Sequence, residues 1–373
     1  MKLALVHDWL NQIGGAEDVL VDLVGMYPQS PIYTSLYDPS AMPDFYRQWD
    51  IRTLWMDKLP AIHRQHQPYL PLYPVAWGGL DLGEYDVILS NKSGFCHGVN
   101  KGSAVHVCYC LAPTRYVWQL DAYIAREGFG KLIDWALRPV VSVLKRWDYQ
   151  AAQRVDHFIA ISTEIQQRIQ TYYGRESVII FPPVDTSRFQ PVPPEQVEDY
   201  YLIVSRLIPY KRIDLAIEAA NRLKLPLKIG GRGRDMERLK ALAGDTVEFL
   251  GYVPDADLPA LMAKCKAFIF PGLEDFGITP VQAAAAGRPV IAYRGGGALD
   301  TVKAGVTGEF FDQMTPESLS AVMARFEAAA YDTQVIRAHA LTFDSAVFRQ
   351  QLGDFVAGAY QAKQAGRTFV WQA

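Results

Sequence analysis

The chain has 373 residues, of which 50% are hydrophobic and 21% are charged. That length exceeds one ordinary hydrophobic core and that composition is typical of a folded protein, so we expect two globular domains and no extended disorder. Lys and Arg number 37 against 40 Asp and Glu, a net charge of −3, which argues against a nucleic-acid binder because such proteins carry a basic excess.

The N-terminal sequence MKLALVHDWLN has too short an apolar run for a secretory signal, and no stretch reaches the roughly 20 apolar residues of a transmembrane helix. The 4 cysteines have neither the spacing of a disulfide framework nor that of a zinc site. We therefore expect a cytoplasmic protein with reduced cysteines.

The first part of the chain alternates apolar strands with amphipathic helices. A strand over residues 3–6 is followed by a glycine turn and by a helix over residues 16–26, an order typical of the start of a doubly wound α/β domain. Residues 59–80, rich in Pro, Tyr and Trp, are expected to form a long irregular loop. Further strands are expected over residues 86–90, 104–110 and 157–161, and a helix capped by Ser162 over residues 165–172.

Five prolines within residues 181–194 prevent a continuous helix or central strand and indicate a domain boundary. The alternation then restarts, with strands expected over residues 200–205, 227–229, 247–250, 267–270 and 289–292. Helices are expected over residues 213–223, 234–243, 258–265 and 280–286. The sequence thus predicts an α/β protein of two Rossmann-like doubly wound domains facing a cleft. The expected bounds are residues 1–185 and 186–345, with a C-terminal helical segment over residues 346–373 packing back on the first domain.

Ligands of open α/β sheets bind beyond the carboxyl ends of the strands, so the loops after the strands are the candidate sites. After the strand over residues 200–205, Arg206 and Lys211 flank Pro209 just before a helix, which suits a diphosphate clamp. After the strand over residues 267–270, Glu274 precedes a helix whose free N–H groups could bind phosphate or sugar oxygens. Taken singly, each loop is equally consistent with a solvated turn or an ordinary strand-to-helix crossover.

In chain order, the segments GGAE, PPVD, SRLIPYK, EDFGITP, AAGRPVIA and GGG resemble the family-4 retaining glycosyltransferases of the GT-B fold. The resemblance covers nearly the whole chain, and the HDWL, YTSLYD and PTRYVW segments are most similar to bacterial O-antigen and exopolysaccharide mannosyltransferases. It implies metal-independent, cofactor-free transfer of a hexosyl, most often mannosyl, group. The implied donor is a nucleotide-diphosphate sugar, with GDP-mannose favoured, and the implied acceptor is a glycan or lipid-linked saccharide in cell-surface polysaccharide synthesis.

The resemblance also implies roles for individual residues. Arg206 and Lys211 would bind the donor diphosphate and Glu274 the transferred sugar, and these three are expected to carry catalysis. The remaining donor-binding residues would be Gly15 from the first domain, Tyr252 and Val253 near the base, Asp275, Phe276, Gly277 and Ile278 near the sugar and phosphate, and Gln282 at the ribose.

Two positions depart from the family pattern. Relatives usually carry Glu where this chain has Gln282, and His where it has Leu111. Because Leu111 cannot replace an imidazole, His7, Asp8 and Arg115 become the candidates for the sugar or acceptor side. The departures leave open a degenerate GT-B protein that binds nucleotide or glycan without transfer. A nucleotide-sugar epimerase on the same fold is a further alternative, which the cations and Glu274 disfavour.

Two more patterns call for an interpretation. Asp255 and Asp257 have the spacing that holds a metal in another transferase fold, but they precede a helix, where Asp is an ordinary cap, so no metal is predicted. Residues 131–148 mix aliphatic and aromatic residues with Lys131, Arg138, Lys145 and Arg146 and could meet an anionic bilayer on the inner face of the plasma membrane. A helix packed on its own domain fits this segment better.

Overall fold

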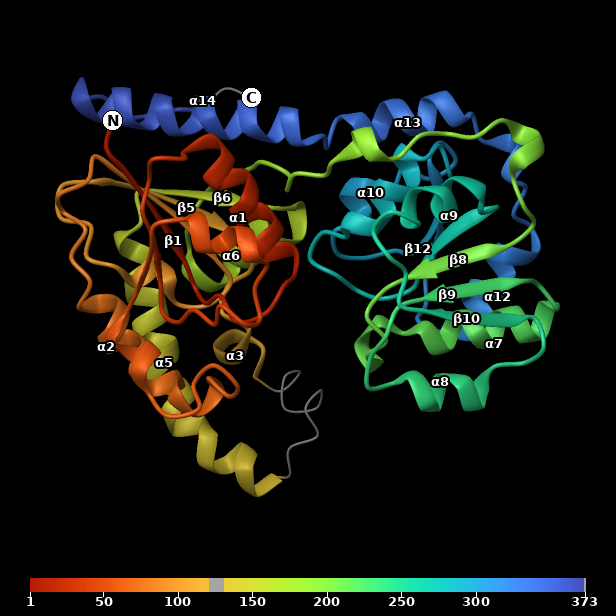
Figure 1. Cartoon of the computed structure of the whole chain (residues 1–373), viewed down its shortest axis with the longest axis horizontal. Helices are drawn as coiled ribbons and strands as arrows, with labels where there is room; N and C mark the ends of the chain where they lie inside the picture. The colour runs from red at the N-terminus through yellow and green to blue at the C-terminus, as the bar shows by residue number, and fades with distance from the viewer. Residues whose placement is uncertain (121–130, 372–373) are drawn as a thin grey trace. The chain divides into compact units, whose positions relative to one another are not determined.

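The computed structural model describes residues 1–120 and 131–371, with the side chains of residues 131–137 outside that description. The chain forms two compact units (Figure 1). Unit 1 contains Met1–Pro183 and Phe348–Ala373, and unit 2 contains Val184–Val347.

Unit 1 is built on a parallel sheet with the strand order β3-β2-β1-β4-β5-β6-β7. Its strands are β1 (Leu3–His7), β2 (Ile32–Thr34), β3 (Ile51–Thr53), β4 (Val87–Lys92), β5 (Val105–Cys110), β6 (His157–Ala160) and β7 (Ser177–Ile179). Every residue of β1, β4 and β5 is buried, as expected for the central strands of a sheet covered on both faces.

Helices cover this sheet. They are α1 (Gly15–Met26), α2 (Tyr73–Gly78), α3 (Arg115–Trp118), α5 (Lys131–Arg154), α6 (Thr163–Tyr173) and α14 (Ser345–Gln364), with the shorter 3-10 helices η1 (Asp44–Gln48), η2 (Trp55–Lys58), η3 (Gln67–Leu72) and η4 (Cys96–Gly98). The predicted Ser162 cap is confirmed, because the Ser162 side chain accepts a hydrogen bond from the N–H of Ile165. From Phe348 onward α14 packs on unit 1, with the Phe348 ring edge-on to Tyr109 of β5 and Phe355 edge-on to His157 of β6.

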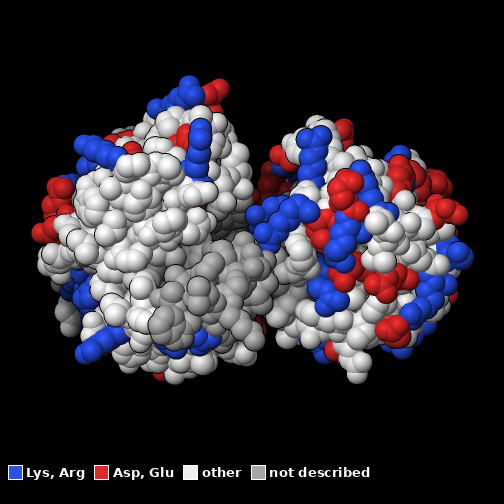
Figure 2. Space-filling model, turned by 90° about the horizontal axis from the view of Figure 1, so that it is seen from below, with Lys and Arg blue, Asp and Glu red and all other residues white. Residues whose placement is uncertain are grey.

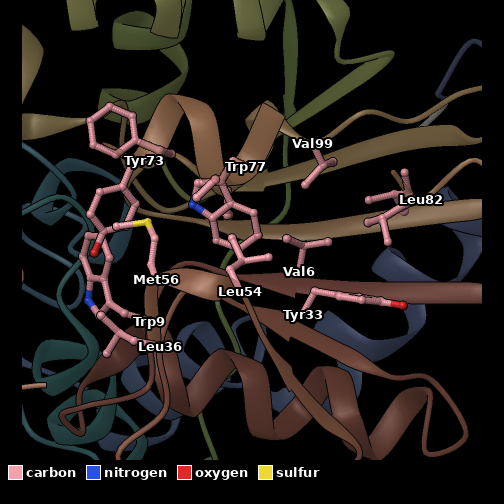
Figure 3. Packing of buried hydrophobic residues seen from close by; sticks show 14 of the residues in the cluster. Val6, Trp9, Tyr33, Leu36, Leu54, Met56, Tyr73, Trp77, Leu82 and Val99 are labelled. Carbon is pink, nitrogen blue, oxygen red and sulfur yellow. The ribbon is translucent and has the colours of Figure 1, made fainter. Parts of the chain in front are cut away.

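The core of unit 1 corrects one expectation. Residues 59–80 do not form a purely irregular loop, because η3 and α2 lie within them. Tyr73 and Trp77 of α2 are fully buried, and Figure 3 shows Trp77 beside Val6 of β1 and Leu54. Pro68 and Pro74 lie in the first turns of η3 and α2, where the missing N–H of a proline would have no helical partner, and Pro71 lies within η3.

Unit 2 contains a second parallel sheet with the strand order β10-β9-β8-β11-β12-β13. Its strands are β8 (Tyr201–Val204), β9 (Leu227–Gly230), β10 (Val247–Gly251), β11 (Ala267–Phe270), β12 (Val290–Tyr293) and β13 (Gly308–Phe311). Its helices are α7 (Ile213–Leu223), α8 (Met236–Leu242), α9 (Leu258–Lys264), α10 (Ile278–Ala285), α11 (Ala298–Thr301), α12 (Pro316–Ala324) and α13 (Thr333–Leu341), with the 3-10 helices η5 (Thr186–Arg188), η6 (Pro194–Gln196), η7 (Pro209–Lys211) and η8 (Ala328–Ala330). The predicted α/β class, with two Rossmann-like parallel-sheet domains, is confirmed.

The two ends of unit 2 meet. Val184 and Asp344 form an isolated parallel bridge, in which the N–H of Val184 donates to the carbonyl of Phe343 at 3.1 Å and the N–H of Ser345 donates to the carbonyl of Val184 at 3.1 Å. The Thr186 hydroxyl also donates to the Asp344 carboxylate. The chain therefore enters and leaves unit 2 at one place.

The surface of unit 2 mixes the two signs of charge. On the face seen in Figure 2, Lys and Arg side chains stand next to Asp and Glu side chains, so this face has no continuous basic stripe. Among the residues that the structure describes, no helix is long and apolar enough to cross a membrane.

Candidate functional site

The loops after β8 and β11 bring two charged side chains together. The two strands are parallel neighbours, with Phe268 opposite Leu202, so their carboxyl ends open on the same edge of the sheet. There Lys211 Nζ forms an ion pair with Glu274 Oε1. The side chains of Lys211 and Glu274 are only 13% and 21% exposed, so water screens this pair less than it would screen a surface pair.

A small cavity lies beside this ion pair. It is lined by the ends of β8 and β11, by Ser205 and Gly272, and by Lys211 and Glu274 themselves. Gly272 favours the close approach of the two loops, because a Cβ there would lie 3.0 Å from the Cα of Lys211, a tight contact. The pair is thus held by backbone packing at the edge where ligands of such sheets bind.

The helix after Glu274 presents backbone donors at the same edge. α10 begins at Ile278, directly after Gly277, whose φ of 93° lies in the left-handed region that favours glycine. Phe276 is buried and anchors the turn, while Asp275 and Ile278 are partly exposed. The first turn of a helix has N–H groups without helical partners, so it suits phosphate or sugar oxygens.

The glycine cluster after β12 supports this turn. The N–H of Gly297 donates to the carbonyl of Glu274 at 2.9 Å. A Cβ at Gly296 would lie 2.2 Å from that carbonyl oxygen, and one at Gly297 would lie 2.2 Å from the Cα of Phe276. The glycines therefore let one loop rest against the next and fix the direction of Glu274.

The other sequence-predicted donor residues of unit 2 are spread along the same edge. Arg206 is exposed and its guanidinium donates to the Tyr210 hydroxyl at 3.5 Å. Tyr252 is 62% exposed, and Val253 packs against Gly230. Gln282 lies within α10 and is partly buried.

Sequence reasoning missed Arg232, in the loop after β9. Its guanidinium lies over the Tyr252 ring, 5.6 Å from the ring centroid. The loop is pressed against the loop that carries Arg206, since a Cβ at Gly233 would lie 2.1 Å from the carbonyl oxygen of Leu207. The signal was the GGRGRD segment directly after a predicted strand, with glycines for close packing and arginines for an anion.

In unit 1, the carboxylate of Asp8 accepts hydrogen bonds from backbone N–H groups. Its Oδ2 accepts the N–H groups of Ser93 and Gly94 at 2.7 and 2.6 Å, and its Oδ1 accepts those of Phe95 and Cys96 at 2.6 and 2.8 Å. The residue is 1% exposed. The carboxylate therefore holds the loop after β4, with little capacity left for a sugar hydroxyl.

His7 is equally enclosed. Its Nε2 lies 3.4 Å from Glu17 Oε1 in the first turn of α1, and its Nδ1 lies 3.2 Å from Asn91 Nδ2. His7 and Glu17 are 1% and 3% exposed. This network supports the turn before α1, where Gly15 is exposed as the first helical residue.

Arg115 differs from these two candidates. It is exposed and begins α3, in the loop that follows β5. Leu111 starts that loop and is partly buried, with its N–H bonded to the carbonyl of Lys92 at 2.8 Å. Of the three sugar-side candidates, Arg115 alone offers an exposed side chain, while His7 and Asp8 have supporting positions.

The structure differs from the helix cap expected at Asp255 and Asp257. Asp257 is at the N-cap position of α9, but its side chain makes no capping hydrogen bond. Both residues are exposed, and the Asp255 carbonyl accepts from Arg188 at 2.8 Å. Among the side chains of residues 1–120 and 138–371, no group of three or more His, Cys, Asp or Glu is arranged to hold a metal ion.

Comparison with known families divides the chain in the same region as the fold does. Residues 13–188 match the family described as "Glycosyltransferase Family 4", and residues 185–337 match "Glycosyl transferases group 1".

Two curated relatives have named activities. The GDP-mannose-dependent alpha-(1-6)-phosphatidylinositol monomannoside mannosyltransferase of Mycolicibacterium smegmatis is 30% identical over 219 residues, 51% of this chain and 56% of the relative. The mannosylfructose-phosphate synthase of Agrobacterium fabrum is 29% identical over 189 residues, 46% of this chain and 37% of the relative. The chain thus spans little more than half the length of the first of these relatives and less of the second.

Solved structures share the fold over nearly the whole chain. HepE of Anabaena in complex with UDP has a TM-score of 0.71 at 20% identity and covers 96% of this chain and 100% of its own. The sucrose-phosphate synthase of Thermosynechococcus elongatus has a TM-score of 0.73 at 16% identity, with 98% and 100% covered. At these identities the likeness establishes the fold.

Proposed function

We propose that this chain, which belongs to the glycosyltransferases and joins a family 4 domain to a group 1 domain, transfers a mannosyl group from GDP-mannose to a glycan or lipid-linked saccharide. The observation that carries the proposal is the Lys211–Glu274 ion pair at the carboxyl edge of unit 2. Two relatives named as mannose-transferring enzymes support the choice of sugar, and one of them is named as GDP-mannose-dependent.

The ion pair suggests how a donor would bind. A nucleotide-diphosphate sugar brings two negative phosphates that compete with Glu274 for Lys211. Once Lys211 turns to the diphosphate, the Glu274 carboxylate becomes available to accept hydrogen bonds from the sugar hydroxyls. The donor would therefore exchange an internal ion pair for two new charge-assisted contacts.

The same edge could stabilise the leaving group. As the bond to the sugar breaks, the diphosphate gains negative charge, which would be met by Lys211, Arg206 and the N–H groups at the start of α10. We propose a metal-independent reaction with retention, in which the acceptor attacks on the face of the leaving phosphate. The phosphate oxygen then takes the proton of the acceptor hydroxyl.

A thermal-shift screen tests the donor. The protein would be melted with GDP, UDP and ADP and with their sugars, and GDP-mannose should stabilise it where UDP-sugars do not. Release of GDP from GDP-mannose without acceptor would then establish an enzyme. Stabilisation by UDP-sugars alone would overturn the choice of donor.

A protein that binds the nucleotide sugar without transfer is the second candidate. Leu111 favours it, since this side chain starts the loop after β5 and can neither donate nor accept a proton. Stabilisation by GDP-mannose with no release of GDP and no transfer would select this candidate.

We also propose a cytoplasmic protein that touches the inner membrane surface through α5. All four cysteines are free and buried, which suits a reducing compartment. On α5, Val143 is 71% exposed and Val140 37% exposed, and the cations Arg138, Lys145 and Arg146 of the same helix are also exposed. Arg146 lies one helical turn from Val143. Exposed aliphatic side chains next to cations suit an anionic bilayer. The side chain of Lys131, part of the same expectation, lies outside the described residues.

Liposome flotation tests this contact. Vesicles with anionic lipid should carry the protein and neutral vesicles should not, and Val143→Ser should weaken the flotation. Val335→Ser, which changes a 46% exposed valine in unit 2, is the matched control. Equal flotation with both kinds of vesicle would dispose of the proposal.

A further inference from the structure

Lys92, the last residue of β4, has a completely buried side chain. Its Nζ donates to the carbonyl oxygen of Ala112 at 3.1 Å and to the Thr114 hydroxyl at 3.3 Å. Its backbone carbonyl accepts the N–H of Leu111 at 2.8 Å. One residue thus holds three positions of the segment 111–118, which follows β5.

Asp148 on α5 supplies the opposite charge and is equally buried. Its Oδ1 accepts from the Thr114 hydroxyl at 2.8 Å. Its Oδ2 accepts from the indole N–H of Trp118 at 2.6 Å and from the Tyr173 hydroxyl at 2.7 Å. The Thr114 hydroxyl therefore stands between the ammonium group and the carboxylate, and segment 111–118 is held near both of its ends.

The charges in this network are set by its surroundings. Burial works against a charged ammonium group, but the Cys110 side chain and the Asp148 carboxylate outweigh it and raise the pKa of Lys92. Burial and the Lys92 charge lower the pKa of His97 well below its usual value. His97 is therefore neutral, and its Nε2–H donates to the backbone carbonyl of Asp148 at 3.3 Å.

Such a network is a costly way to fill a core. Two buried charges lose their hydration, and well-packed apolar residues of similar volume are often no less stable in the same place. Lys92 and Asp148 form directional hydrogen bonds, which apolar residues cannot form. Each of these hydrogen bonds fixes the position of one atom of the segment. These hydrogen bonds therefore hold segment 111–118 in one conformation.

The segment lies at the carboxyl edge of the unit 1 sheet, the edge at which ligands of open α/β sheets bind. β4 and β5 are parallel neighbours, with Lys92 opposite Cys110, so segment 111–118 leaves the carboxyl edge of the sheet. Its exposed member is Arg115, at the start of α3. The Thr114 hydroxyl also contacts the carbonyl oxygen of Gly94 at 2.6 Å, which ties the segment to the loop after β4.

We propose that Lys92 and Asp148 are positioning residues that fix segment 111–118, so that Arg115 meets the acceptor saccharide in one orientation. This inference rests on the proposed transfer reaction. Neither residue touches a substrate, and both act through Thr114 and the backbone of the segment.

The decisive variant is the double substitution Lys92→Met and Asp148→Asn. Removing both charges together avoids leaving one of them buried without a partner, the change that most often prevents folding. Thr114→Val is a milder second variant, since it removes only the bridging hydroxyl. Lys101→Met is the matched control, because Lys101 forms an ion pair with Asp156 in unit 1, away from the segment.

Two measurements are made on the full chain. The first is hydrogen exchange of segment 111–118, followed by mass spectrometry. The second is transfer from GDP-mannose to whichever of methyl, octyl and decyl mannoside the wild-type protein uses best, with KM determined for the donor and for the acceptor. The double variant should exchange the segment at least tenfold faster and raise the acceptor KM at least tenfold, with the donor KM within twofold. Thr114→Val should move both readouts in the same direction, and Lys101→Met should move neither.

Unchanged exchange of the segment in the double variant and in Thr114→Val would overturn the proposal, as would an unchanged acceptor KM in both. If the double variant does not fold, Thr114→Val decides alone. Failure of the proposed function looks different, because the wild-type protein would then neither transfer nor hydrolyse GDP-mannose, while the exchange measurement would still report on the segment.

Discussion

Lys211 and Glu274 form an ion pair across the carboxyl ends of β8 and β11, two neighbouring strands in the middle of the sheet of unit 2. Without a donor, each of these charges neutralises the other. In the proposed reaction, a nucleotide sugar would therefore have to replace an ion pair that already exists.

Removing the cation should weaken the reaction more than it weakens the fold. Lys211→Ala removes a cation that we propose binds the leaving diphosphate, so turnover should fall at least tenfold, equivalent to about 1.4 kcal/mol of transition-state stabilisation. The turnover of Arg206→Ala should fall by a similar factor. The control is Lys240→Ala, which breaks an exposed pair with Glu237 on α8. Near-normal turnover in both Lys211→Ala and Arg206→Ala would reject the assignment of the donor site.

The Gln282 position offers a gain-of-function test. A carboxylate forms a stronger hydrogen bond to a ribose hydroxyl than an amide does, by about 1 kcal/mol. Gln282→Glu should therefore lower the donor KM by roughly fivefold. Gln313→Glu, an exposed position of the same unit, is the control for added negative charge. A donor KM that does not move would mean that Gln282 lies away from the ribose.

We expect the Asp8 carboxylate to stabilise the fold of unit 1. Four backbone N–H groups point at its carboxylate, and an asparagine would turn an NH2 group toward two of them. Asp8→Asn should therefore destabilise the protein by roughly 2–4 kcal/mol, seen as a lower melting temperature, whereas Asp44→Asn at an exposed position should not. Full stability combined with lost turnover would instead make Asp8 a sugar-facing residue.

Unit 1 should lose stability in mild acid. Burial lowers the pKa of His66 to about 4, with the Asp8 carboxylate opposing this only in part, against 6.5 for a free histidine. Between these two values the unfolded chain binds the proton and the folded chain does not, so protonation favours unfolding as the pH falls. The melting temperature should drop between about pH 6.5 and pH 4. His66→Gln should make this drop smaller, and an unchanged slope would contradict the assignment.

Some strands and helices of this fold can be predicted from the local sequence, and others cannot. The strands over residues 86–90 and 104–110 were predicted because short, mainly apolar runs are typical of parallel strands buried on both faces. β2 and β3 were not, since three residues are too few to show a period. α2 was missed because prolines mark its start and two of its buried residues, Tyr73 and Trp77, are aromatic.

The same limit applies to the site. The position of Lys211 and Glu274 in loops that follow strands was enough to suggest that they belong to one edge, because the loops at the carboxyl ends of parallel strands open together. Asp8 looked like a ligand-facing carboxylate at the end of a strand. Its partners are backbone groups at Ser93 to Cys96, which no pattern near Asp8 reveals. Long-range backbone contacts of this kind are the part that sequence reasoning cannot supply.

The bridge between Val184 and Asp344 has a consequence for biosynthesis. Unit 2 is an insertion between two segments of unit 1, and its own ends are pinned together. As the chain leaves the ribosome, unit 2 can complete its sheet before Phe348 and Phe355 have emerged and can pack on β5 and β6. The unit whose translation begins first is therefore completed last, because the sheet of unit 1 stays uncovered at β5 and β6 until α14 has left the ribosome.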